Sequence, residues 1–96
     1  MTLRARFAGG TEARTAAFLL GRYAEEQDRS VDDAIRWYDT YLTEAASGEF
    51  AGDALGRKML LVAQSQGRDA AKSLAERYLQ RFPGGPYEAA AHDLVQ

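Results

Sequence analysis

Apolar residues recur along this chain at intervals of three and four positions, which is the spacing of one face of an α-helix. The clearest segment covers residues 30–46, where the apolar positions are Val31, Ala34, Ile35, Tyr38, Tyr41, Leu42 and Ala45. The Ser30 hydroxyl can accept a hydrogen bond from a first-turn amide, and Asp32 and Asp33 suit the positive end of a helix. The pattern therefore predicts a helix that begins at Ser30 and ends before Gly48.

Two further helices are predicted around this segment. One extends from Thr11, which can cap it, to about Gln27, and its inward positions are Ala13, Ala16, Ala17, Leu20, Tyr23 and Ala24. The other covers about residues 49–66, and its inward positions are Phe50, Ala54, Leu55, Leu61 and Val62. Gly52 and Gly56 either weaken this helix, because glycine costs about 1 kcal/mol relative to alanine, or allow another helix to approach closely.

The C-terminal part of the chain predicts two helices separated by a turn rich in proline and glycine. The first covers residues 68–82 and carries Ala71, Leu74, Ala75, Tyr78, Leu79 and Phe82 on one face. Pro83 ends it, because proline lacks an amide hydrogen, and Pro86 suits the first turn of the next helix. That last helix carries Tyr87, Ala90, Ala91, Leu94 and Val95. No segment alternates with the period of two that is typical of strands, so the predicted fold class is all-α.

The apolar positions also repeat along the chain with a period of 37 residues. At this shift the matched pairs are Ala34 and Ala71, Tyr41 and Tyr78, Leu42 and Leu79, Gly48 and Gly85, Phe50 and Tyr87, and Ala54 and Ala91. Residues 6–10 match residues 81–85 at a shift of 75, which is about two periods. Periods of this size are typical of solenoids of helix pairs, in which stacked neighbours complete one continuous core.

Three motifs resemble the tetratricopeptide repeat. Two of them resemble its second helix: Ala34-x3-Tyr38-x2-Tyr41-Leu42 and Ala71-x3-Ala75-x2-Tyr78-Leu79-x3-Pro83. The third, Ala17-x2-Leu20-Gly21, resembles its first helix. The string from Tyr78 to Tyr87 looks like the subtype found in bacterial envelope proteins, such as outer-membrane assembly lipoproteins and the periplasmic repeat protein of the Tol-Pal system. Leu20-Gly21-Arg22 and Gly56-Arg57-Lys58 look like repeats attached to bacterial anti-sigma or iron-dicitrate-sensor-type regulators.

The resemblance implies a right-handed solenoid of antiparallel helix pairs with about five helices. Residues 1–10 would be the tail of a preceding helix or a frayed N-terminus, 11–46 the first pair, 47–83 the second pair, and 84–96 the start of a third repeat or a capping helix. It also implies a protein–protein interaction scaffold within a larger bacterial envelope or regulatory protein, periplasmic or envelope-associated rather than cytoplasmic. The alternative is a structural spacer or oligomerisation segment without a partner groove.

Composition excludes several classes of function. The 96 residues include no cysteine and one histidine, His92, so disulfides, thiolate metal sites and paired-histidine metal sites are excluded. The net charge is −2, and the sequence has no basic stripe of the kind that binds nucleic acid. No apolar run approaches the ~20 residues that a membrane span needs. No combination of nucleophile, base and orienting residue is visible, so we expect no enzymatic activity, no cofactor and no metal.

The partner expected for this chain is a protein or peptide. On a helical projection Phe18 lies opposite the stripe centred near Leu20, and in a tetratricopeptide-like stack that face lines the concave surface. An aromatic residue flanked by arginine suits a peptide with an acidic or apolar side chain. The candidate partner-binding residues are Arg14, Phe18, Arg22, Glu25, Arg57 and Lys58. The other interpretation is that Phe18 packs against a preceding helix. The apolar face of residues 87–95 is predicted to promote homo-oligomers.

Overall fold

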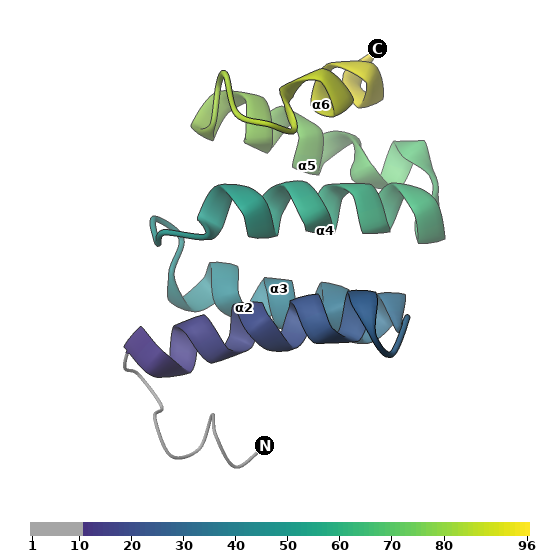
Figure 1. Cartoon of the computed structure of the whole chain (residues 1–96). Coiled ribbons are helices and arrows are strands. Elements are labelled where there is room, and N and C mark those ends of the chain that lie inside the picture. Colours follow the sequence, from purple (N-terminus) through teal and green to yellow (C-terminus); the bar gives the residue numbers. More distant parts are fainter. Residues whose placement is uncertain (1–10) are drawn as a thin grey trace. The chain divides into compact units, whose positions relative to one another are not determined.

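The computed structural model describes residues 11–96, with side chains from Thr15 onward, and its regular elements in this range are all helices. They are α2 (Thr11–Glu26), α3 (Val31–Glu44), α4 (Ala51–Gln66), α5 (Arg68–Arg81) and α6 (Glu88–Val95) (Figure 1). The all-α fold class and the five predicted helices are confirmed. The predicted tail over residues 1–10 lies outside the described residues.

The ends of the helices follow local chemistry. Ser30 is the N-cap of α3, and its hydroxyl accepts a hydrogen bond from the Asp33 amide at 3.4 Å, as predicted. Gly67 precedes α5 with a positive φ of 98°, a conformation that glycine adopts without steric cost. The last helix begins at Glu88, whereas Pro86 predicted a start two residues earlier.

The chain divides into two compact units, residues 1–51 and 52–96. In the described part of the first unit, α2 and α3 are antiparallel and lie side by side (Figure 1). Their linker is closed by a 2.9 Å hydrogen bond from the Ser30 amide to the Ala24 carbonyl, with Arg29 in the left-handed region at φ 54°. The second unit contains α4, α5 and α6, and α6 packs on α5.

The core of the first unit corrects the predicted orientation of α2. Its buried side chains from α2 and α3 are those of Ala16, Ala17, Phe18, Ala24, Ala34, Tyr38 and Tyr41. Tyr23 is 56% exposed, so its predicted inward position is wrong. A Cβ atom at Gly21 would lie 2.6 Å from the Tyr38 ring. The Tyr38 ring therefore packs directly on the backbone of α2, and this contact turns Gly21 and Phe18 inward.

In the second unit, aromatic rings pack against the glycines of α4. A Cβ atom at Gly56 would lie 2.2 Å from the Tyr87 ring, and one at Gly52 would lie 3.2 Å from the Phe82 ring. What approaches these glycines closely is an aromatic side chain, and not another helix as one of the two interpretations had it. The Tyr87 hydroxyl donates to Asp53 Oδ1 at 2.6 Å, which holds the ring in place.

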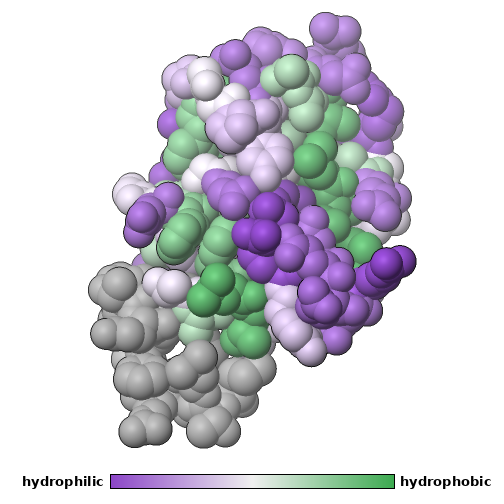
Figure 2. Space-filling view, viewed as in Figure 1, coloured by the Kyte–Doolittle hydropathy of each residue, from purple (hydrophilic) through white to green (hydrophobic). Residues whose placement is uncertain are grey.

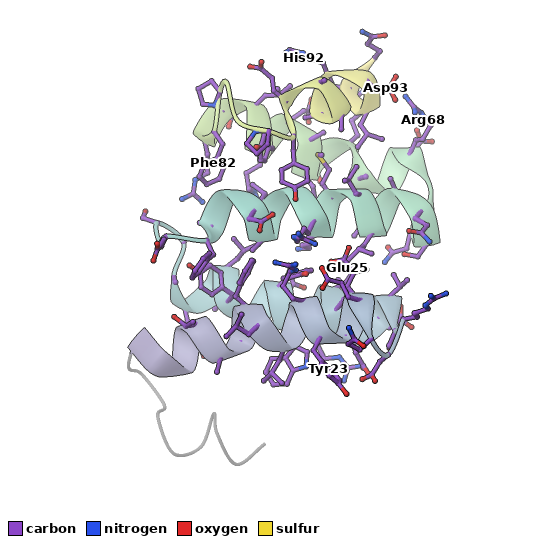
Figure 3. All side chains as sticks on the ribbon, viewed as in Figure 1. Tyr23, Glu25, Arg68, Phe82, His92 and Asp93 are labelled. Atoms are coloured by element: carbon purple, nitrogen blue, oxygen red, sulfur yellow. The ribbon has the colours of Figure 1, made fainter. Side chains whose placement is uncertain are left out.

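The apolar face of α6 is largely covered within the second unit. Ala91 is fully buried and Leu94 is 7% exposed, and the outer surface at α6 is mostly hydrophilic in the view of Figure 2. Arg68 at the start of α5 binds the Asp93 carboxylate at 3.0 Å and the Asp93 carbonyl at 2.5 Å (Figure 3). Self-association through this helix stays a prediction, but Ala91 and Leu94 are not exposed for it.

Candidate functional site

The turn that follows α3 is built around the hydroxyl group of Tyr41. This hydroxyl accepts a hydrogen bond from the Phe50 amide at 2.9 Å, and Tyr41 is only 2% exposed. A Cβ atom at Gly48 would lie 2.5 Å from the same oxygen, so any larger residue would displace it. The Gly48 amide also donates to the Ala45 carbonyl at 2.9 Å. One buried tyrosine thus fixes the path of the chain from the end of α3 to Phe50.

The turn that follows α5 has the same geometry. The Tyr78 hydroxyl accepts from the Tyr87 amide at 3.1 Å, and a Cβ atom at Gly85 would lie 2.3 Å from it. The residue after each helix adopts nearly the same conformation, with φ −144° and ψ 57° at Ala45 and φ −132° and ψ 51° at Phe82. The equivalent residues are 37 positions apart, so the period predicted from the sequence recurs in the geometry of the two turns.

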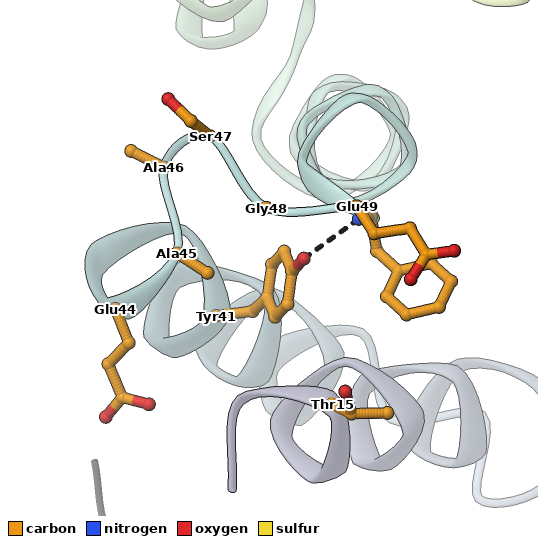
Figure 4. A pocket seen from close by; sticks show the side chains of 9 residues that line it. Thr15, Tyr41, Glu44, Ala45, Ala46, Ser47, Gly48 and Glu49 are labelled. Carbon is orange, nitrogen blue, oxygen red and sulfur yellow. Dashed lines mark hydrogen bonds between the residues drawn. The ribbon is translucent and has the colours of Figure 1, made fainter. Parts of the chain in front are cut away.

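The two turns differ in what fills the space beside the tyrosine. In the second unit, the Phe82 ring lies 5.5 Å from the Tyr78 ring and contacts the backbone at Gly52. In the first unit the equivalent residue is Ala45, which has no ring. A hollow of about 390 Å³ borders Ala45 (Figure 4), and its lining residues are Thr15, Tyr41, Glu44, Ala45, Ala46, Ser47, Gly48, Glu49 and Phe50.

The hollow combines an aromatic wall with an acidic rim. The Phe50 ring stacks on the Phe18 ring, with centroids 4.6 Å apart and planes within 7° of parallel. Glu44 and Glu49 supply carboxylates, and Thr15 and Ser47 supply hydroxyl groups. The C-terminal end of α3 has no basic residue in its last turn, so the negative end of the helix dipole adds to this potential. These groups suit a ligand that has both an apolar and a cationic part.

Phe18 does not lie on an accessible surface, which is a correction of the partner-binding prediction. It is 3% exposed, and its ring centroid lies 5.9 Å from that of Tyr38 and 5.7 Å from that of Tyr41. With Phe50 these rings form one aromatic cluster inside the first unit. Phe18 is therefore a core residue and cannot contact a peptide directly.

The other predicted partner-binding residues take part in local interactions or lie outside what is described. Arg22 forms an ion pair with Glu26 at 2.7 Å, and Glu25 accepts a hydrogen bond from the Tyr38 hydroxyl at 2.7 Å. In the second unit Arg57 binds Asp53 at 2.9 Å, and Lys58 is half-buried. The backbone of Arg14 lies in α2, but its side chain is outside the described residues.

The two tyrosine-anchored turns and the hollow beside the first were not predicted from the sequence. A signal for the turns was present, because a tyrosine, a glycine seven residues later and an aromatic residue two residues after that occur in both halves. A signal for the hollow was also present, since the first turn has Ala45 at the position where the second turn has Phe82. Neither signal could be interpreted without knowing that the hydroxyl group reaches across the loop.

We predict that Tyr78→Phe lowers the free energy of unfolding by about 1–2 kcal/mol, because it leaves the Tyr87 amide without the Tyr78 acceptor. Urea denaturation followed by circular dichroism measures this change. Tyr23→Phe is the matched control, since Tyr23 is 56% exposed, and we expect it to change stability by less than about 0.5 kcal/mol. Equal effects of the two substitutions would contradict the anchoring role of the hydroxyl group.

The described residues define this chain as an all-α protein with two tyrosine-anchored turns of the same geometry. Within the described part, no group of three His, Cys, Asp or Glu residues could hold a metal ion, and no helix is long and apolar enough to cross a bilayer. Comparisons of the chain with models of known families, with curated proteins and with solved structures found no match.

Proposed function

We propose that this chain is a protein–protein interaction module made of tetratricopeptide-like helix pairs that stack as a right-handed solenoid. The observation that carries the proposal is the recurrence of one design in both units: a helix pair that ends in a turn anchored by a buried tyrosine. The bacterial envelope setting rests on the resemblance of residues 78–87 alone. Arrays of such pairs present extended surfaces to protein partners, which is why this function fits the design.

The buried positions support the same proposal. In α3 and α5 they recur at a shift of 37, in the pairs Ala34 and Ala71, Tyr38 and Ala75, and Tyr41 and Tyr78. In α2 and α4 they recur at a shift of 38, in the pairs Ala16 and Ala54, Ala17 and Leu55, Phe18 and Gly56, Gly21 and Met59, and Ala24 and Val62. The extra residue is consistent with the longer linker after α2. Two helix pairs that bury equivalent positions are what a repeat architecture requires.

The exposed apolar residues favour a binding role over a spacer. Leu19 and Tyr23 are 55% and 56% exposed, and a separation of four residues makes them neighbours on one face of α2. A pure spacer gains nothing from such a pair, whereas exposed apolar side chains on one face are typical of interaction surfaces. We keep the spacer as the alternative that the following experiment tests.

Selection from a random peptide library on the immobilised full chain tests the proposal. We expect enriched peptides that bind the folded chain saturably with one peptide per chain, measured by isothermal titration calorimetry. Failure to obtain any saturable ligand for a chain shown to be folded by circular dichroism would favour the spacer. A crystal structure in which no rotation and translation along an axis relates the two helix pairs would overturn the solenoid.

A further inference from the structure

We propose that the hollow beside Tyr41 binds an aromatic side chain of a partner peptide in which the neighbouring residue is basic. The proposal rests on the interaction function proposed above and specifies the chemistry of the partner. The reasons are that the second unit has an aromatic residue at the position equivalent to Ala45, that the Phe50 wall of the hollow suits a ring, and that Glu49 gives its rim a negative charge.

The second unit shows what fills this place when the chain itself supplies it. There the Phe82 ring packs beside the Tyr78 ring, and the Arg81 guanidinium lies 5.6 Å from the Phe82 ring centroid. The backbone angles are φ −132° and ψ 51° at Phe82, and φ −144° and ψ 57° at Ala45. The two residues therefore differ by 12° in φ and 6° in ψ. The same backbone conformation therefore carries a ring in the second turn, whereas Ala45 brings no ring to the first.

The size and the walls of the hollow suit an aromatic side chain. Its volume of about 390 Å³ lies within the range of roughly 300–1,000 Å³ that is typical of ligand pockets. Tyr41 and Phe50 line it, and their ring centroids are 6.3 Å apart at a tilt of 59°. Tilted and edge-on aromatic arrangements contribute about 0.5–1.5 kcal/mol beyond the burial of area. An inserted ring would make such a contact with the half-buried Phe50 ring, because Tyr41 is only 2% exposed and offers almost no ring surface.

The charge of the rim points to a basic residue next to the ring. In the second unit the residue before the ring is Arg81, whereas the equivalent residue in the first unit is Glu44. Pro86 of the second turn is likewise replaced by Glu49. The exposed Glu49 carboxylate and the negative end of α3 therefore make the potential at the first turn negative. A ligand that supplies both a ring and a cation complements this arrangement.

The probe for this proposal is the peptide acetyl-Gly-Arg-Phe-Gly-amide, titrated into the full-length chain and followed by NMR chemical shifts. We expect saturable binding at about millimolar concentration, with shifts at Gly48 and Phe50. The control peptides replace Phe by Ala or Arg by Glu, and we expect each to bind at least about tenfold more weakly. Equal binding of all three peptides would overturn the proposal.

Variants of the chain locate the site. Ala45→Phe places a ring in the hollow, and we expect it to weaken binding of the probe at least about tenfold while the chain stays folded. Glu49→Lys reverses a charge on an exposed residue and should also weaken binding about tenfold, whereas Glu76→Gln, at an exposed position of α5, should leave it unchanged. Binding unaffected by both Ala45→Phe and Glu49→Lys would overturn the proposal.

Two other occupants are distinguished by the same samples. If a second copy of the chain fills the hollow, sedimentation velocity will show a dimer that Ala45→Phe abolishes. If the chain's own Arg6 and Phe7 fill the hollow, the probe will fail to bind the parent chain and will bind only the Phe7→Ala variant. Either result overturns a partner peptide as the occupant. Library peptides that still bind the Ala45→Phe variant would leave the interaction function intact, so the two proposals fail separately.

Discussion

Phe18→Ala is expected to lower the free energy of unfolding of this chain by about 3–4 kcal/mol. The side chain is 3% exposed, and its ring contacts those of Tyr38, Tyr41 and Phe50. Truncation leaves a cavity that these large, mutually packed rings cannot fill by small movements. Because small domains are stable by only about 5–15 kcal/mol, this loss is a large part of the total. Urea denaturation followed by circular dichroism measures it.

Leu19→Ala is the matched control for this prediction. Leu19 is the next residue of the same helix and is 55% exposed, so we expect a loss below about 1 kcal/mol. A Phe18→Ala variant with unchanged stability and weakened peptide binding would restore Phe18 to the partner surface and contradict its place in the core. Equal losses for the two substitutions would contradict the orientation of α2.

Gly56→Ala is expected to lower the free energy of unfolding by about 2 kcal/mol, although helix propensity alone predicts a gain of about 1 kcal/mol. The added Cβ atom would lie 2.2 Å from Cδ2 and 2.3 Å from Cγ of Tyr87. The ring cannot move aside freely, because the Tyr87 amide donates to Tyr78 and its hydroxyl donates to Asp53. The sign of the change, measured by urea denaturation, therefore separates local propensity from tertiary packing.

A double-mutant cycle with Tyr87→Ala supplies the control. Removal of the ring relieves the clash, so Gly56→Ala is expected to stabilise the Tyr87→Ala background by up to about 1 kcal/mol. The interaction energy between the two substitutions should then be about 2–3 kcal/mol. A Gly56→Ala variant that is more stable than the parent chain in both backgrounds would show that the ring yields without cost.

Much of the secondary structure could be predicted because its causes are local. Ser30 caps α3 through a hydrogen bond three residues along the chain, and Gly67 separates α4 from α5 through its own backbone freedom. The buried faces of α3 and α5 follow regular stripes of apolar residues, so periodicity alone identified most of them. The 37-residue period likewise belongs to the sequence, and the two turns share it.

The orientation of α2 could not be predicted in the same way. Alanines occur on more than one side of this helix, so several faces are almost equally apolar, and the stripe that included Tyr23 was one of them. The choice is made by Tyr38, a residue of the next helix, because its ring fits over Gly21 and leaves Phe18 facing the aromatic cluster. Only contacts between residues distant in the chain contain that information.

The sequence by itself determined the all-α fold class, the five helices and the repeated spacing of tyrosine, glycine and aromatic residues, because helix formation and capping act within a few residues. The tertiary structure alone decided that Phe18 is buried, that the Tyr41 hydroxyl binds the Phe50 amide, and that Ala45 borders an open hollow. Each of these depends on how large side chains share space across helices and turns, and volume is matched in three dimensions rather than along the chain.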